Sequence, residues 1–99
     1  MTKKTTNSYI FTPNFDPKKR KISQIKFLIF HYTGMVSEKK AIKKLCNHNT
    51  KVSCHYFIKR NGNIIKMLPE LYIAWHAGKS YWKNFSNLNK HSIGIEIHN

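Results

Sequence analysis

The dipeptide Asn61–Gly62 lies in the middle of the segment VSCHYFIKRNGNIIKML, residues 52–68. Asn and Gly both accept the positive φ that tight hairpin turns require, and the flanking residues are β-branched and aromatic, as in strands. This segment is therefore predicted to form a β-hairpin, and any fold of the chain must accommodate it.

The last eight residues, SIGIEIHN, alternate as a strand does. Successive side chains of a strand point to opposite faces, so the three isoleucines are predicted to face a core. Gly94, Glu96 and His98 would then share the other face, which carries a carboxylate and an imidazole.

The remaining elements follow from two further patterns. Residues 22–33, ISQIKFLIFHYT, contain the most apolar run and are predicted to form a strand buried on both faces. Ser37 is placed to cap a helix that carries Glu38 in its first turn and an apolar stripe ending near Cys46. Strand, helix, hairpin, loop and strand in this order predict an α/β (α+β) fold, a mixed central β-sheet with covering helices.

Length and charge set limits on the domain organisation. The 99 residues allow one domain, predicted over residues 23–99, with residues 1–22 as a polar, irregular leader.

Eighteen basic against four acidic residues give a formal charge of +14, which suits polyanionic partners. Because only Arg20 and Arg60 are arginines, nucleic acid is a disfavoured partner, although a basic nucleic-acid-binding protein stays an alternative.

The sequence has no apolar run long enough for a membrane span, and no apolar segment follows the basic N-terminus as in a signal peptide. These features predict a cytoplasmic location. Cys46 and Cys54 are accordingly predicted to be free thiols.

Histidines at strand ends and in loops are the first candidates for chemistry: His31, His55, His76 and His98. Each can bind a metal or transfer a proton, but a single histidine in such a position is more often a hydrogen-bonded structural residue. Glu96 stands out because burial among isoleucines would raise its pKa, as suits a general base. A salt bridge to one of the lysines is the alternative for Glu96.

Several segments, in order along the chain, resemble the zinc-dependent N-acetylmuramoyl-L-alanine amidases of the amidase-2 type. They are PNFDPKKR at 13–20, HYTGM at 31–35, VSCHYFIKRNGNI at 52–64, AWHAG at 74–78 and NLNKHSIGIEIHN at 87–99. The resemblance implies a peptidoglycan recognition protein-like fold. It also implies zinc-dependent hydrolysis of the amide between the lactyl group and L-alanine, in peptidoglycan or in muropeptides of bacterial cell wall recycling.

The resemblance also implies roles for particular residues. His31 matches the first zinc ligand, and Glu96 matches the catalytic glutamate that activates the zinc-bound water. Cys54 stands where related phage and animal proteins have a tyrosine, which places this chain in the glutamate-dependent branch. The expected walls of the substrate groove are His55, Trp75, His76, Ala77 and Gly78.

In that family the chain continues beyond this last strand into a helix and then supplies a second histidine and an Asp or Cys as zinc ligands. With three protein ligands in such a site, His31 is the one that this sequence provides. The chain is therefore predicted to be an inactive, truncated amidase domain with exposed apolar sheet surface. Alternatives are a muropeptide-binding module without catalysis and a fragment that pairs with a separately encoded C-terminal half.

Overall fold

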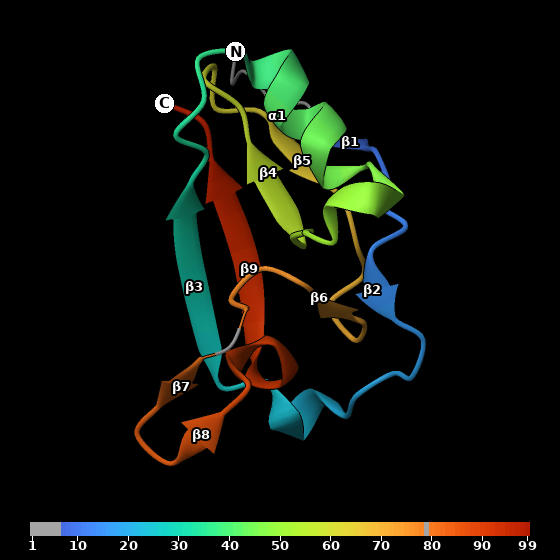
Figure 1. Cartoon of the computed structure of the whole chain (residues 1–99), viewed down its shortest axis with the longest axis vertical. Coiled ribbons are helices and arrows are strands. Elements are labelled where there is room, and N and C mark those ends of the chain that lie inside the picture. The colour runs from blue at the N-terminus through green and yellow to red at the C-terminus, as the bar shows by residue number, and fades with distance from the viewer. Residues whose placement is uncertain (1–6, 79) are drawn as a thin grey trace, which may run out of the picture.

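The computed structural model describes residues 7–78 and 80–99. Five strands form the central sheet in the order β1-β5-β4-β9-β3 (Figure 1). Strand β9 is parallel to both of its neighbours, β3 and β4, whereas β4 and β5 are antiparallel. The strands are β1 (Asn7–Tyr9), β3 (Phe27–Tyr32), β4 (Tyr56–Ile58), β5 (Ile64–Lys66) and β9 (Ser92–Ile97).

The smaller elements surround this sheet. Two short antiparallel pairs are β2 (Phe15–Asp16) with β6 (Ile73–Ala74), and β7 (Tyr81–Trp82) with β8 (Phe85–Ser86). One α-helix, α1 (Glu38–Leu45), lies over the sheet (Figure 1). The described residues also form three 3₁₀ helices, η1 (Ile22–Gln24), η2 (His48–Thr50) and η3 (Leu88–His91). The predicted α+β fold with a mixed sheet is confirmed.

The predicted hairpin is formed by β4 and β5, with Phe57 opposite Ile65. Its connection is longer than a two-residue turn. The Gly62 N–H donates to the Lys59 carbonyl at 2.9 Å, and Gly62 alone of the Asn–Gly pair takes a positive φ, 89°. This is the pattern of a turn closed by a glycine bulge, in which only the last loop residue needs the left-handed region.

Helix α1 begins and ends close to where its capping pattern predicts. The Ser37 Oγ accepts the Lys40 N–H at 3.1 Å, and Glu38 lies at the positive end of the helix dipole. Ala41 and Leu45 are buried against Cys54, Phe57, Ile65 and Met67, which together form the core. No helix among the described residues is long and apolar enough to cross a membrane.

The face of the sheet that α1 covers is opposite to the one predicted. On the face of Glu96, Ser92, Gly94 and His98 are buried, whereas on the isoleucine face Ile93 is buried and Ile95 and Ile97 are only half-buried. The register places His31, Glu96, Phe57 and Ile65 in one row across four strands, on the face beneath α1. The alternation of β9 was therefore predicted correctly, but the assignment of its core face was wrong, because only tertiary packing decides which face a helix covers.

Strand β3 is not buried on both faces as predicted. It lies at the edge of the sheet, and Leu28, Phe30 and Tyr32 are 59%, 55% and 66% exposed. They are in register with the isoleucines of β9 and so share their face. The predicted exposure of apolar sheet surface is confirmed on this face.

The polar leader is also more ordered than predicted, over its described residues 7–22. Its strand β1 extends the main sheet beside β5, and β2 pairs with β6. Thr12, Asn14 and Arg20 are buried, and their side chains bond to main-chain carbonyls of distant residues, such as Thr12 Oγ1 to Leu45 O at 2.6 Å. A leader without periodicity can thus be fixed by long-range polar contacts, which a pattern analysis does not detect.

Cys46 and Cys54 are free thiols, as predicted. Cys54 is fully buried beside Met67, and burial raises the pKa of its thiol far above the ordinary value. It acts as a small core residue, since a thiol held protonated is a poor nucleophile.

Candidate active site

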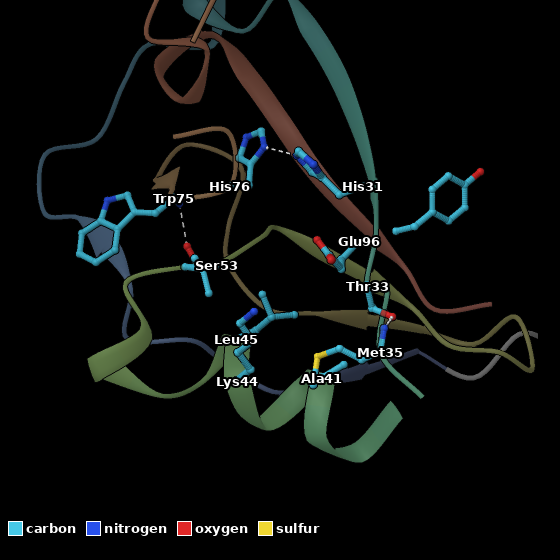
Figure 2. Close-up of a pocket in the computed structure, with 12 residues that line it drawn as sticks. His31, Thr33, Met35, Ala41, Lys44, Leu45, Ser53, Trp75, His76 and Glu96 are labelled. Carbon is cyan, nitrogen blue, oxygen red and sulfur yellow. Dashed lines mark hydrogen bonds between the residues drawn. The ribbon is translucent and has the colours of Figure 1, made fainter. Parts of the chain in front are cut away.

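His31 and Glu96 lie side by side on the neighbouring strands β3 and β9. The parallel register pairs these two residues, so their side chains point from the same face of the sheet. They line a pocket of about 260 Å³ together with Lys44 of α1 and with Ser53, Trp75 and His76 (Figure 2). Two residues predicted from distant motifs are therefore brought to one site by strand pairing.

Glu96 occupies a position between the core and the pocket. Its neighbour in the row on β4 is the fully buried Phe57, whereas on the other side it adjoins His31. Burial raises the pKa of Glu96, and electrostatic attraction to the nearby His31 and Lys44 side chains opposes that shift. A carboxylate with a raised pKa accepts a proton more readily near neutral pH, as a general base must.

The alternative role for Glu96, a salt bridge to a lysine, is not what the structure shows. Across residues 7–78 and 80–99 the ion pair joins Lys59 to Glu38, at 3.8 Å, and neither residue lines the pocket. Glu96 is thus half-buried and has no lysine partner in an ion pair among the described residues.

His76, from the loop after β6, packs directly against β9. Its Nδ1 lies 3.0 Å from the Nε2 of His31, and its Nε2 lies 3.0 Å from the Oγ of Ser92. The ring covers Gly94 so closely that a Cβ there would lie 2.5 Å from the His76 Cγ. Burial, followed by the nearby charges of His31, His55 and Arg20, lowers the pKa of His76 to about 3.

The contact with His76 explains the glycine of the SIGIE motif. We expect Gly94→Ala to lower the free energy of unfolding by roughly 1–3 kcal/mol, because the new methyl group overlaps the imidazole. Urea denaturation of the variant measures this loss.

A double-mutant cycle with His76→Ala is the control for this prediction. Once the ring is removed, Gly94→Ala is expected to cost much less. Additive losses in the double variant would show that the methyl group does not act through His76.

His55 does not line the pocket, although the resemblance implied that it would. It is 0% exposed. Its Nδ1 accepts the Gly94 N–H at 3.0 Å, and its Nε2 must then donate to the Tyr72 carbonyl at 2.8 Å. Both nitrogens join β9 to the segment before β6, which gives His55 a structural role in this fold. Its contact with substrate stays a prediction.

His98 is buried as well, at 1% exposure, and lies outside the pocket. Arg60 donates to its Nε2 at 3.0 Å, so its Nδ1 donates to the Thr33 Oγ1 at 2.7 Å. These bonds join the hairpin turn to the end of β3. His98 is therefore a hydrogen-bonded structural histidine, one of the two roles that the sequence left open.

The WHAG segment contributes to the pocket and to a neighbouring hollow of about 540 Å³. Trp75 borders both, and its indole Nε1 donates to Asp16 Oδ1 at 2.7 Å. Gly78 borders the second hollow only, and the Ala77 N–H donates to Asn89 Oδ1 at 2.8 Å. Substrate contact by Trp75, His76, Ala77 and Gly78 stays a prediction.

Asn89 and Ser92 are two residues of the site that the sequence analysis did not single out. Asn89 Oδ1 accepts the N–H groups of both His76 and Ala77, and Ser92 bonds the His76 ring. Ser92 was detectable in principle, because it precedes Gly94 and Glu96 at intervals of two and so shares their face. Nothing local marks Asn89.

The fit of the pocket to a zinc ion depends on its donor atoms. Zinc sites of hydrolases use three protein ligands and keep one position open. Among residues 7–78 and 80–99 there is no group of three or more His, Cys, Asp and Glu side chains arranged to hold a metal. The donors described here therefore do not complete a zinc site, and His31 contributes one ligand at most from the predicted set.

The fold is a mixed sheet in which a histidine and a half-buried glutamate are paired across two parallel strands. Residues 21–99 match the Amidase_2 family, N-acetylmuramoyl-L-alanine amidase. The chain belongs to this family, whose members are in general zinc-dependent enzymes.

Similar proteins include the N-acetylmuramoyl-L-alanine amidase AmiD of Escherichia coli, which is 37% identical over 83 residues, 77% of this chain and 29% of AmiD. A structure of AmpDh3 from Pseudomonas aeruginosa is 32% identical, with a TM-score of 0.68 over 100% of this chain and 40% of that chain. A crystal structure of an AmpD derivative, 22% identical, has the same fold, with a TM-score of 0.76 over 94% of this chain and 61% of that one. The chain thus spans under a third of the length of AmiD.

Proposed function

We propose that the pocket beside β9 binds a muropeptide and places its lactyl–L-alanine amide next to Glu96, as part of an N-acetylmuramoyl-L-alanine amidase site. The observation that carries this proposal is the pairing of a half-buried Glu96, whose pKa is raised, with His31 on the adjacent strand. Support comes from AmiD, whose solved complex holds anhydro-N-acetylmuramic acid-L-Ala-D-γ-Glu-L-Lys. The AmpDh3 structure holds an anhydromuramic pentapeptide.

In this proposal Glu96 is the general base. Its carboxylate takes a proton from the attacking water and returns it to the amine that leaves the carbonyl carbon. Lys44, exposed on α1 at the pocket, faces the negative charge of the peptide carboxylates. The donors among the described residues do not by themselves complete a zinc site.

Binding and turnover are therefore expected to separate. The 99-residue chain is expected to bind muropeptide without hydrolysing it, and turnover is expected only when another segment, such as a separately encoded C-terminal half, supplies the missing ligands. A cytoplasmic location stays a prediction.

The test is a calorimetric titration with anhydro-N-acetylmuramic acid-L-Ala-D-γ-Glu-L-Lys, with and without a chelator, followed by chromatography for released peptide. We expect saturable binding in both conditions and no release. Lys44→Ala is expected to weaken binding about two- to fivefold, as for an exposed ion pair, and Lys40→Ala, on the same helix but outside the pocket, is the matched control.

Two results would overturn this proposal. Absence of saturable binding would exclude muropeptide as the ligand of this pocket. Salt-sensitive binding of duplex DNA instead would favour the nucleic-acid alternative. Release of peptide by the 99-residue chain, lost in Glu96→Gln, would show that its metal site is complete and that the proposed separation is wrong.

The raised pKa of Glu96 makes a separate prediction about stability. A carboxyl whose pKa is higher in the folded state stabilises the fold below its ordinary pKa, near 4.5, and loses that contribution as the pH rises through the raised value. Glu96→Gln is therefore expected to increase the free energy of unfolding at pH 7. The increase should vanish below the ordinary pKa of glutamate, as measured by urea denaturation at both pH values.

The outcome that contradicts this prediction is an equal gain at neutral and acidic pH. In that case the amide would stabilise the pocket by new contacts, and the ionisation of Glu96 would not be the cause.

A further inference from the structure

A chain of hydrogen bonds leads from the main chain to His31 and determines where its protons lie. The Ser92 Oγ is 2.6 Å from the Leu88 carbonyl oxygen and 3.0 Å from the His76 Nε2. A carbonyl only accepts, and a hydroxyl has one proton, so Ser92 donates to Leu88. The Ser92 oxygen therefore accepts from His76, whose proton must be on Nε2.

The proton on Nε2 of His76 also determines the role of the other nitrogen of that ring. A neutral imidazole carries one N–H, so a proton on Nε2 leaves Nδ1 as an acceptor. The His31 Nε2 lies 3.0 Å from that Nδ1 and must be the donor. His31 then has its lone pair on Nδ1, for which no hydrogen bond is found among the described residues.

The His76 ring is fixed on its other sides as well. Asn89 accepts its backbone N–H at 3.1 Å, and Gly94 leaves room for the ring against β9. His55 does not compete for the ring, because its own nitrogens bond to Gly94 and Tyr72. The rings of His76 and His31 meet edge to face, at 70° and 5.2 Å between centroids, which holds His31 in one orientation.

We propose that Ser92 and His76 are positioning residues that hold His31 in its Nε2-protonated tautomer, so that Nδ1 is its one basic nitrogen. The functional meaning rests on the proposed amidase site, in which His31 stands beside the base Glu96. Any proton or cation that His31 takes up would then enter at Nδ1, on a ring that does not need to turn. Preorganisation of this kind lowers the cost of reaching the reactive geometry.

The test is long-range ¹H–¹⁵N correlation NMR of the histidine rings in the full 99-residue chain, ¹⁵N-labelled and chelator-treated, near neutral pH. We expect His31 and His76 each to show a protonated Nε2 and an unprotonated Nδ1. In Ser92→Ala, the Nε2–H of His76 loses its hydrogen-bond acceptor, so both tautomers of His76 become available. The His31 signals are then expected to move to the average of two tautomers. Ser86→Ala, an exposed serine on β8, should leave them unchanged.

The wild-type spectrum alone can overturn the proposal, by showing the His31 proton on Nδ1. A fixed His31 tautomer in a folded Ser92→Ala chain would also overturn the proposal. If Ser92→Ala does not fold, His76→Phe is measured in its place, and a fixed His31 tautomer in that variant has the same meaning. The muropeptide titration is independent of these spectra. A fixed His31 tautomer in a chain that does not bind muropeptide would support the positioning roles of Ser92 and His76 and contradict the proposed function.

Discussion

Acidification from pH 6.5 to pH 3 is expected to remove on the order of 4 kcal/mol from the free energy of unfolding through His76 alone. The pKa of His76 is about 3 in the fold against 6.5 as its ordinary value. Between these values the unfolded chain binds a proton that the folded chain excludes, so stability is complete above 6.5 and falls as the pH drops. His55, whose pKa is also lowered by burial, acts in the same direction.

The loss is large compared with the 5–15 kcal/mol that typically stabilise a domain. Urea denaturation at a series of pH values measures its slope. His76→Phe is expected to flatten the slope, whereas His48→Gln, at an exposed position in η2, should leave it unchanged. Glu96 acts in the opposite sense, so the series is best repeated in Glu96→Gln.

An unchanged slope in His76→Phe would contradict this prediction. The acid sensitivity would then arise from other groups, and the neutral state of the buried His76 ring would not be its cause.

The second large effect is expected at the centre of the core. Phe57→Ala should lower the free energy of unfolding by roughly 3–5 kcal/mol, the usual range for a buried phenylalanine. Phe57 is 0% exposed, packs beneath α1 and stacks on His98 at 6.3 Å between ring centroids. The loss of the ring therefore opens a cavity that borders both the helix and the row leading to Glu96.

Phe30→Ala is the matched control, because Phe30 belongs to the same sheet but is 55% exposed on the opposite face. Its replacement is expected to cost less than about 1 kcal/mol. Circular dichroism during urea unfolding compares the two variants. Similar losses would show that the exposed face contributes to the core as much as the face under α1.

Local structure was largely predictable from the sequence. The Asn–Gly hairpin, the Ser37 cap and the alternation of β9 depend on neighbours within a few residues, and all three are present. Even here the detail differed, because the turn needed a positive φ at Gly62 only. The resemblance to amidases placed His31 and Glu96, and their pairing across β3 and β9 brought them together.

The roles of the histidines could not be predicted in the same way. His55 and His98 have the same strand-end context as His31, yet both are buried with both ring nitrogens bonded. His76 lies in the pocket because Gly94 and Asn89, 18 and 13 residues away in sequence, leave room for it and hold its loop. Such contacts depend on chain segments that meet only after folding.

The sequence by itself determined the hairpin, the helix, the two long strands β3 and β9 and the family to which the chain belongs, because these depend on short-range preferences and on motif order. Only the tertiary structure decided which face of the sheet is covered, that the leader adds strands, and which histidine meets Glu96. The physical reason is that burial and proton positions are set by long-range packing. A strand pattern specifies two faces, but the elements that pack on them determine which one becomes the core and which residues form a site.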